Sequence, residues 1–205
     1  MKTCRHCGAT LSRTETTFED IIIGQEHAKR ALEVALAGQH TISFIGRDEA
    51  EALAEWAVKH GLTAWAVQPC PCGYFGEPTK ECTCSLSQVS KWQKRKAYQN
   101  ALNAEIVVEC PGPYPYQIDA WANGKQGEPE AAMLARVEAK GQRPEPTLDQ
   151  TSRSLLSVAT NQLSLGTDRV RSIISVAQTI AALAKANQIQ VCHLAEAIQY
   201  RPRKY

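Results

Sequence analysis

The chain has 205 residues, 43% of them hydrophobic and 21% charged, which is typical of a globular protein with one sizeable core. Its net charge of +2 excludes an overall electrostatic attraction to nucleic acid, and no apolar run reaches the roughly 20 residues that span a bilayer. The first residues lack the apolar segment of a secretory signal, so we expect a cytoplasmic protein without a membrane span.

The N-terminal half predicts helices alternating with strands. A small polar leader, Met1–Thr16, precedes a helix with an entry loop over Phe18–Gln39. A strand (Thr41–Ile45), an amphipathic helix (Asp48–His60) and a second strand (Leu62–Val67) follow. This order is a βαβ unit, so we expect the two strands to pair in parallel through a right-handed crossover.

The middle of the chain is expected to add one more strand. Ser87–Leu102 predicts a basic helix or helix–turn, and Glu105–Cys110 a third strand. Pro111–Pro129 is rich in proline, tyrosine and glycine, which predicts an ordered loop or linker. A helix over Glu130–Lys140 comes next, and Gly141–Pro146 is the clearest break and our best domain boundary.

The C-terminal part predicts three helices, over Thr151–Leu165, Asp168–Ala186 and Val191–Tyr200. The first two carry an apolar stripe at helical spacing, which is typical of helices that share a core. We therefore expect an α/β part followed by an all-helical part.

Four cysteines in one short stretch are the strongest chemical signal. They have the spacing C-x-C-x9-C-x-C and are Cys70, Cys72, Cys82 and Cys84. Zinc in structural sites takes four tetrahedral ligands and favours thiolates, so we expect a closed zinc knuckle. Eight cysteines without an export signal also favour metal ligation in a reducing compartment. The alternative is two disulfides or free buried thiols.

A second cysteine pair, Cys4 and Cys7, has the C-x2-C spacing of half a zinc ribbon. The missing ligands could come from Cys110, Cys192 or His193, or from a second copy of the chain. The alternative is a frayed leader without a metal.

Cations and aromatic rings interleave directly after the knuckle, at Lys91, Trp92, Lys94, Arg95, Lys96 and Tyr98. Such a segment can bind nucleic acid, with the cations on phosphates and the rings on bases. The alternative is a solvated basic helix face.

Four stretches of the chain resemble the magnesium-chelatase-like AAA+ ATPases of the ComM type. Phe18–Gly46 is similar to the entry into the nucleotide site of that family, and Cys70–Ser85 to its cysteine knuckle. Val89–Pro111 is similar to the stretch that carries its arginine finger, and Val176–Pro202 to the end of its helical lid. Together they cover well over half of the chain.

The resemblance implies a reduced AAA+ fold. The family arranges its strands in the order 5-1-4-3-2, and the three strands kept here correspond to the first, fourth and fifth. They would therefore lie side by side as a three-stranded parallel sheet, with Leu62–Val67 as an exposed edge that invites pairing with another chain. The expected parts are a leader over 1–16, an α/β core over 17–129 with the knuckle at 69–85, and a helical lid over 130–205.

The phosphate loop of the family is degenerate in this chain. A P-loop needs glycines, a lysine for the phosphates and a hydroxyl for Mg²⁺. The loop would begin at Gly46, but Ala52 stands at the lysine position and Leu53 at the hydroxyl position. Asn103 stands at the arginine-finger position, and the chain between Gly46 and the knuckle is too short for a Walker B strand. We therefore expect no catalytic residues and no bound ATP.

The residues together predict a non-hydrolysing relative of these ATPases, stabilised by structural zinc, that acts as a binding or assembly module. Its expected partner is a full-length AAA+ ring or another copy of itself. One alternative is a protein that still binds ATP through unconventional contacts. The other is a zinc-dependent nucleic-acid-binding protein that uses Lys91–Lys96.

Overall fold

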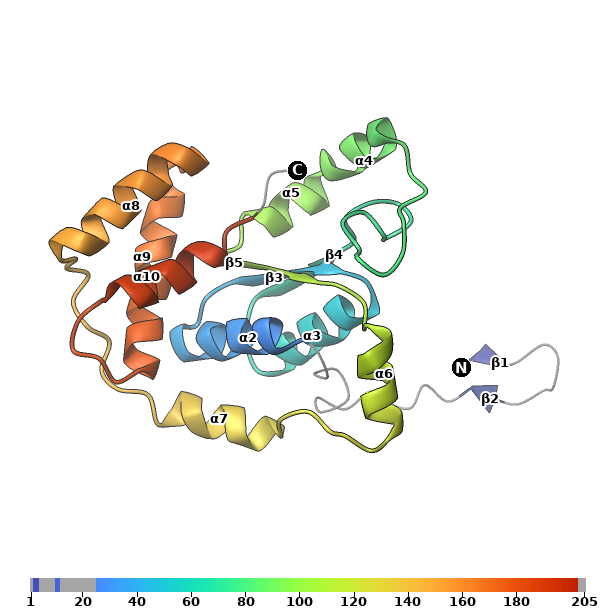
Figure 1. Cartoon of the computed structure of the whole chain (residues 1–205), viewed down its shortest axis with the longest axis horizontal. Helices are drawn as coiled ribbons and strands as arrows, with labels where there is room; N and C mark the ends of the chain where they lie inside the picture. The colour runs from blue at the N-terminus through green and yellow to red at the C-terminus, as the bar shows by residue number, and fades with distance from the viewer. Residues whose placement is uncertain (1, 4–9, 12–24, 203–205) are drawn as a thin grey trace.

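The computed structural model describes residues 2–3, 10–11 and 25–202. At its centre is a three-stranded parallel sheet in the order β4-β3-β5, formed by Ala64–Val67, Ile42–Gly46 and Ile106–Cys110 (Figure 1). The prediction of an α/β chain with these three strands side by side is confirmed. A separate antiparallel pair joins two short N-terminal strands, β1 (Lys2–Thr3) and β2 (Thr10–Leu11).

The two faces of the sheet are covered unequally. Helices α2 (Glu26–Gly38) and α3 (Asp48–Lys59) pack on the face that carries the side chains of Ile42, Phe44 and Ile106, all fully buried. The alternate side chains, among them Ile45, Val107 and Trp65, form a smaller cluster with the end of α5 (Lys96–Leu102) on the other face. This alternation is the one that the pleat of a strand imposes.

The segment predicted as a loop, Pro111–Pro129, contains a helix, so that prediction is wrong. Helix α6 (Pro115–Ala122) begins with proline at its first position, where the fixed φ of the ring suits a helix and no N–H is needed. The side chain of Gln117 accepts a hydrogen bond from the Tyr114 N–H at 2.6 Å and closes the first turn. The basic segment after the knuckle likewise forms two helices, α4 (Leu86–Gln93) and α5.

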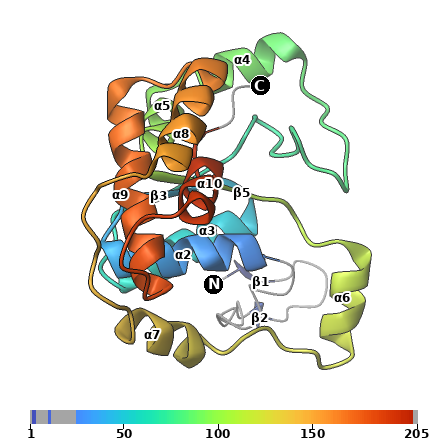
Figure 2. The ribbon, with the colours of Figure 1, turned by 60° about the vertical axis from the view of Figure 1, so that its left-hand side comes forward.

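Helices follow one another from α7 (Glu130–Glu138) to the C-terminal end. α8 (Gln150–Leu163), α9 (Thr167–Leu183) and α10 (Val191–Gln199) gather at one end of the sheet (Figure 2). Their apolar faces join the same buried cluster as α2 and the sheet. Within the described part of the chain, no helix combines the length and the apolar character that a membrane span requires.

Candidate metal centre and the β3–α3 junction

The four knuckle cysteines converge on one point. Their sulfur atoms all lie within 4.8 Å of one another, and the Cys70–Cys72, Cys70–Cys82 and Cys72–Cys82 pairs are separated by 3.4, 3.6 and 3.6 Å. Sulfurs about 2.3 Å from a zinc ion at tetrahedral angles would be separated by about 3.8 Å. A disulfide needs about 2.05 Å, so these thiols are free and arranged as ligands. The cluster could hold a metal ion.

Two glycines allow the knuckle to turn back on itself. Gly73 and Gly76 both have a φ of +81°, which residues with a Cβ rarely adopt. The Gly73 N–H donates to the Cys70 carbonyl at 3.1 Å and closes the first turn, and the Cys84 N–H donates to the Cys82 sulfur at 3.4 Å. Backbone N–H groups aimed at sulfur stabilise a thiolate, which is the form that binds a metal.

The thiols of the cluster differ in acidity. Burial acts to raise the pKa of Cys72, but hydrogen bonds from the backbone of Tyr74 and Thr83 outweigh it and lower that pKa to about 5. Burial raises the pKa of Cys82 to about 12, and hydrogen bonds with the sulfurs of Cys72 and Cys70 act in the same direction. One thiol of the cluster therefore ionises readily and a second resists ionisation, because two neighbouring thiolates repel each other.

Both ends of the knuckle are fixed by helix α4. Ser85 caps the helix: its hydroxyl accepts from the Gln88 N–H at 3.3 Å, and the Gln88 side chain accepts from the Ser85 N–H at 2.8 Å. The Trp92 indole N–H donates to the Gln68 carbonyl at 2.8 Å, and the Gln93 amide donates to the Pro69 carbonyl. The entry and exit of the knuckle are therefore held by one short helix.

The middle of the knuckle lies over the end of β3, where the phosphate loop of the family would begin. The Arg47 guanidinium stacks on the Tyr74 ring at 4.4 Å and donates to its hydroxyl, and the Lys80 ammonium also lies against that ring at 4.3 Å. The Glu77 carboxylate accepts from the Gly112 N–H at 2.9 and 3.1 Å. The knuckle is thereby tied both to the β3–α3 junction and to the end of β5.

The β3–α3 junction itself contains no loop. β3 ends at Gly46 and α3 begins at Asp48, so Arg47 alone joins them. Gly46 lies so close to β5 that a Cβ would meet the Cys110 carbonyl oxygen at 2.3 Å. A cavity of about 230 Å³ remains between this junction and the knuckle, below the roughly 300 Å³ at which ligand pockets begin.

Three carboxylates lie on the α3 side of the same junction. Asp48, Glu49 and Glu51 occupy the first turn of α3. Burial, together with the charges of Asp48 and Glu77, raises the pKa of Glu49. These carboxylates complement the helix dipole and would repel a phosphate.

The guanidinium of Arg169 lies beside the position where the family resemblance places an arginine finger. Asn103 follows α5, and the guanidinium of Arg169 reaches that end of the helix from α9. It donates to the carbonyls of Leu102 at 2.9 Å, Ala104 at 2.8 Å and Glu105 at 3.2 Å. Arg169 therefore fastens α9 to the α5–β5 connection.

In the basic segment after the knuckle the cations are exposed, whereas the aromatic rings are covered or buried. Lys91, Lys94, Arg95 and Lys96 are all exposed. The Trp92 ring is half-buried and covered by the Arg95 guanidinium at 4.0 Å, and Tyr98, named in the same sequence pattern, is buried. This surface offers phosphate contacts without an open aromatic platform.

The second cysteine pair, Cys4 and Cys7, lies outside the described residues. Of its proposed complements, Cys110 is buried and Cys192 is exposed on α10, while the His193 ring accepts from the Gln190 N–H. Among residues 25–202 the knuckle is the one group of three or more side chains arranged to hold a metal.

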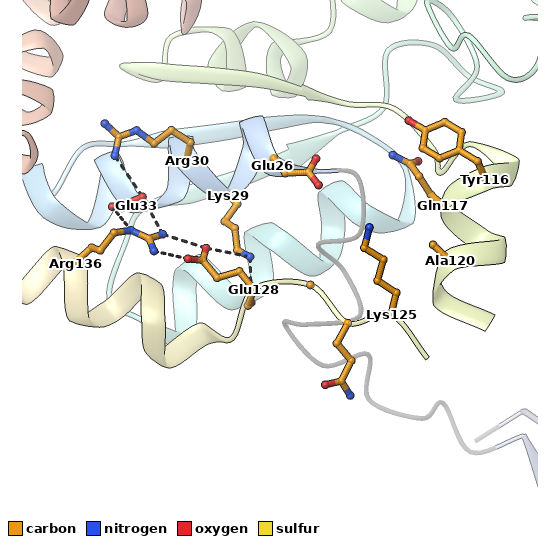
Figure 3. Close-up of a pocket in the computed structure, with 12 residues that line it drawn as sticks. Glu26, Lys29, Arg30, Glu33, Tyr116, Gln117, Ala120, Lys125, Glu128 and Arg136 are labelled. Atoms are coloured by element: carbon orange, nitrogen blue, oxygen red, sulfur yellow. Dashed lines mark hydrogen bonds and ion pairs between the residues drawn. The ribbon is translucent and has the colours of Figure 1, made fainter. Parts of the chain in front are cut away.

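A polar cleft of about 570 Å³ between α2 and α6 was not predicted from the sequence (Figure 3). Its charges pair within the protein: Arg136 donates to Glu33 at 2.9 Å and also to Glu128, while Lys29 lies 3.3 Å from Glu128. Arg30 pairs with Glu33 on the same helix at 3.3 Å. These pairs join α2 to α7 and to the segment before α7. The signal in the sequence is a charged residue at nearly every turn of the otherwise apolar α2.

Comparison with known proteins assigns the family. Residues 121–201 match the family model described as magnesium chelatase, subunit ChlI C-terminal. Residues 17–52 and 48–109 match the model described as magnesium chelatase, subunit ChlI. No curated protein matches the chain. The two models divide the chain after β5, between the sheet with its knuckle and the helices that follow, and the chain belongs to the magnesium-chelatase-like family.

Proposed function

We propose that this chain is a non-hydrolysing member of its family, a binding module built on a reduced AAA+ core, a zinc knuckle and a helical lid. The observation that carries the proposal is the direct passage from β3 into α3 through Arg47, with the knuckle lying over it. A triphosphate needs a loop of backbone N–H groups around it, and a one-residue junction cannot supply that loop.

The side chains around the junction support the same conclusion. Ala52 and Leu53 carry neither the cation nor the hydroxyl that phosphoryl transfer needs, and both lie within α3. Asp48 and Glu49 add negative charge where phosphates would approach. No transition-state charge could be stabilised by this arrangement.

Calorimetric titration with MgATP and MgADP tests the proposal. We expect no heat of binding up to millimolar nucleotide and no phosphate release above a mock preparation. Saturable binding that disappears in an Arg47→Glu variant but persists in a Lys59→Glu variant would instead support the residual ATP-binding alternative. Lys59 lies at the other end of α3 and serves as the matched control.

We propose that the metal is zinc, because four thiolates at tetrahedral separations form the preferred closed site of that ion. The ion would supply the positive charge that four converging thiols lack and would fix the loop from Cys70 to Cys84 over the junction. A site of this kind also fits a reducing compartment such as the cytoplasm.

The partner proposed for the module is a full-length ATPase ring of its own family. Helix α6 and the residue before it expose Tyr114, Tyr116, Ile118 and Trp121, four of the seven large hydrophobic side chains exposed in the described part of the chain. An apolar surface of this density is typical of protein–protein contacts.

Analytical ultracentrifugation with a purified full-length family member tests this docking. We expect the chain to co-sediment with the ring and an Ile118→Asp variant to lose binding at least tenfold. A Val158→Asp variant, which places the same charge at an exposed position on α8, should bind normally. Equal loss in both variants would contradict the role of α6.

A second candidate function is nucleic-acid binding, favoured by the exposed cations Lys91, Lys94, Arg95 and Lys96. Replacing Lys91, Lys94 and Lys96 by alanine should weaken binding to single-stranded DNA and lower its salt slope by about 2, since each phosphate contact contributes about 0.7. The matched control replaces Lys59, Lys125 and Arg171. If both triple variants weakened binding equally, the binding would depend on overall positive charge and not on a site at Lys91–Lys96.

A further inference from the structure

The open edge of the central sheet is β4. The Ile42 N–H donates to the Thr63 carbonyl at 3.1 Å, and Ser43 lies opposite Trp65 in the register of the two strands. Because N–H and C=O groups point alternately to either side of a strand, Thr63 and Trp65 direct theirs toward β3. Ala64 and Ala66 therefore direct their backbone groups away from the sheet. In the described residues, no strand lies beyond β4 (Figure 1).

The open stretch is short and has defined ends. Before it, the Leu62 N–H donates to the Ala57 carbonyl at the end of α3, and after it, the Gln68 carbonyl accepts from the Trp92 indole. Between these points lie the N–H and C=O groups of Ala64 and Ala66, to which no hydrogen bond runs from elsewhere in residues 25–202.

Apart from its short length of four residues, this edge lacks the features that keep edges unpaired. Natural edge strands carry lysine, proline, an inward-pointing charge or a bulge. β4 reads Ala-Trp-Ala-Val, is regular in register with β3 and is half-buried at all four residues. Its backbone is therefore available to another strand.

We propose that β4 pairs antiparallel with β4 of a second copy of this chain, with the two-fold axis at Trp65. In that register Ala64 faces the partner's Ala66, and Ala66 faces the partner's Ala64. Outward-facing residues set directly opposite each other exchange both of their hydrogen bonds, so all four open groups of each copy are satisfied. The two sheets become one six-stranded sheet, β5-β3-β4 in each half.

The side chains favour a second copy over an unrelated strand. Trp65 would face the partner's Trp65 as a non-hydrogen-bonded pair, in which Cα atoms approach to about 4.5 Å and aromatic rings contact. Helix α3 packs beside β4, and the symmetry runs the two α3 helices antiparallel. The acidic first turn of each α3 then lies toward the end of the other, where Lys59 and the exposed Val58 are found.

Amide hydrogen exchange on the intact protein tests the proposal by NMR across a concentration series. The amides of Ala64 and Ala66 should become at least tenfold more protected as the dimer forms. The amides of Trp65 and Val67, which point toward β3, should stay equally protected throughout and serve as the internal control. Sedimentation equilibrium should report a monomer–dimer equilibrium over the same range.

An Ala66→Pro variant removes one outward N–H without touching the β3–β4 ladder. We expect it to remain monomeric, with an unchanged circular dichroism spectrum. If that variant fails to fold, the exchange measurement on the native chain still decides. A protein that stays monomeric at every concentration up to about 0.5 mM would overturn the proposal. A dimer in which the amides of Ala64 and Ala66 exchange freely would also overturn it. The edge geometry does not depend on the proposed function, so either can fail alone.

Discussion

Cys84 and Cys192 illustrate how the role of a cysteine depends on its surroundings. The Cys84 sulfur lies within the knuckle, where the other three sulfurs are within 4.8 Å. Cys192 is exposed on α10, and its thiol reaches the side chain of Gln190 at 3.8 Å. The first is one of four converging thiols that could hold a metal ion, whereas the second lies on a helix surface and has no other cysteine beside it in the described residues.

Replacing Cys84 by serine should therefore abolish metal binding. We expect the metal content, about one ion per chain in the native protein, to fall to near zero because a hydroxyl is a poor zinc ligand. The thermal midpoint should fall as well, since metal binding contributes folding free energy. Elemental analysis and a thermal melt check this prediction. Cys192→Ser should leave both quantities unchanged, and a metal content that Cys84→Ser does not alter would place the ion elsewhere.

Arg169 and Arg171 form a second contrasting pair. Arg169 donates to three carbonyls at the α5–β5 connection, whereas Arg171, two residues later, is largely exposed and lies 3.5 Å from Asp168. Burial lowers the pKa of Arg169, and its hydrogen bonds keep it satisfied. Its role is to join helix and strand.

Arg169→Ala should destabilise the protein by about 2 kcal/mol, because three half-buried carbonyls lose their charged donor. The change should appear as a lower urea midpoint with an unchanged slope. Arg171→Ala should cost less than about 0.5 kcal/mol, as exposed pairs contribute little. Similar losses of stability in the two variants would mean that water molecules donate to these carbonyls when Arg169 is removed.

At the scale of elements, helix α2 is linked to α7 by charge as well as by packing. Glu33 on α2 is buried and accepts from Arg136 on α7, which also binds Glu128 (Figure 3). Hydrogen bonds from Arg136 first, then from Lys29, lower the pKa of Glu128 to about 2. Glu128 thus remains charged well below the pH at which an unfolded glutamate becomes protonated.

This shift predicts how stability depends on pH. The folded pKa of Glu128 lies below its unfolded value of 4.5, so its contribution is complete above about pH 5 and is lost as the pH falls toward 2. Glu128→Gln should cost about 1 kcal/mol at pH 7, a figure reduced for the partial exposure of the pair. The difference from the native chain should shrink between pH 5 and pH 2.

Denaturant unfolding at a series of pH values measures this difference. Glu138→Gln, an exposed change at the end of the following helix α7, is the control and should track the native chain at every pH. A loss in Glu128→Gln that stayed constant down to pH 2 would show that the side chain acts through packing and not through its charge.

At the scale of the whole molecule, the sheet and the C-terminal helices share one buried core. Residues of α2, β3, α9 and α10 belong to the same cluster. The buried His40 joins these parts again, because its ring contacts the Thr179 hydroxyl on α9 at 2.8 Å and the Glu105 carboxylate at 3.3 Å. The knuckle, in contrast, is attached to this core through a few polar contacts.

Metal removal should consequently affect one region. After treatment with a strong chelator, we expect faster hydrogen exchange over residues 70–84 and around Gly112, because Glu77 and Tyr74 lose their fixed positions. Amides of α9 and α10 should exchange as before. Exchange mass spectrometry checks this, and unfolding of the whole chain on chelation would contradict it.

Local patterns predicted much of this molecule. Apolar periodicity located α3, the C-terminal helices and the three strands, and the family resemblance supplied the strand order because it implied which strands had been lost. The cysteine spacing predicted that the four thiols come together, because the glycines between the two C-x-C pairs let the segment turn back on itself. The α6 helix was missed because Pro115 and the neighbouring tyrosines resemble a loop, although a proline suits the first turn of a helix.

The sequence by itself determined the three central strands, most of the helices and the grouping of the four knuckle cysteines, because these depend on residues close together in the chain. Only the tertiary structure decided that the knuckle lies over the β3–α3 junction and that Tyr98 is buried. It also decided that Arg169 donates to backbone carbonyls and that the backbone groups of Ala64 and Ala66 point away from β3. Each of these depends on contacts between distant segments, which the packing of the core fixes and no local pattern records.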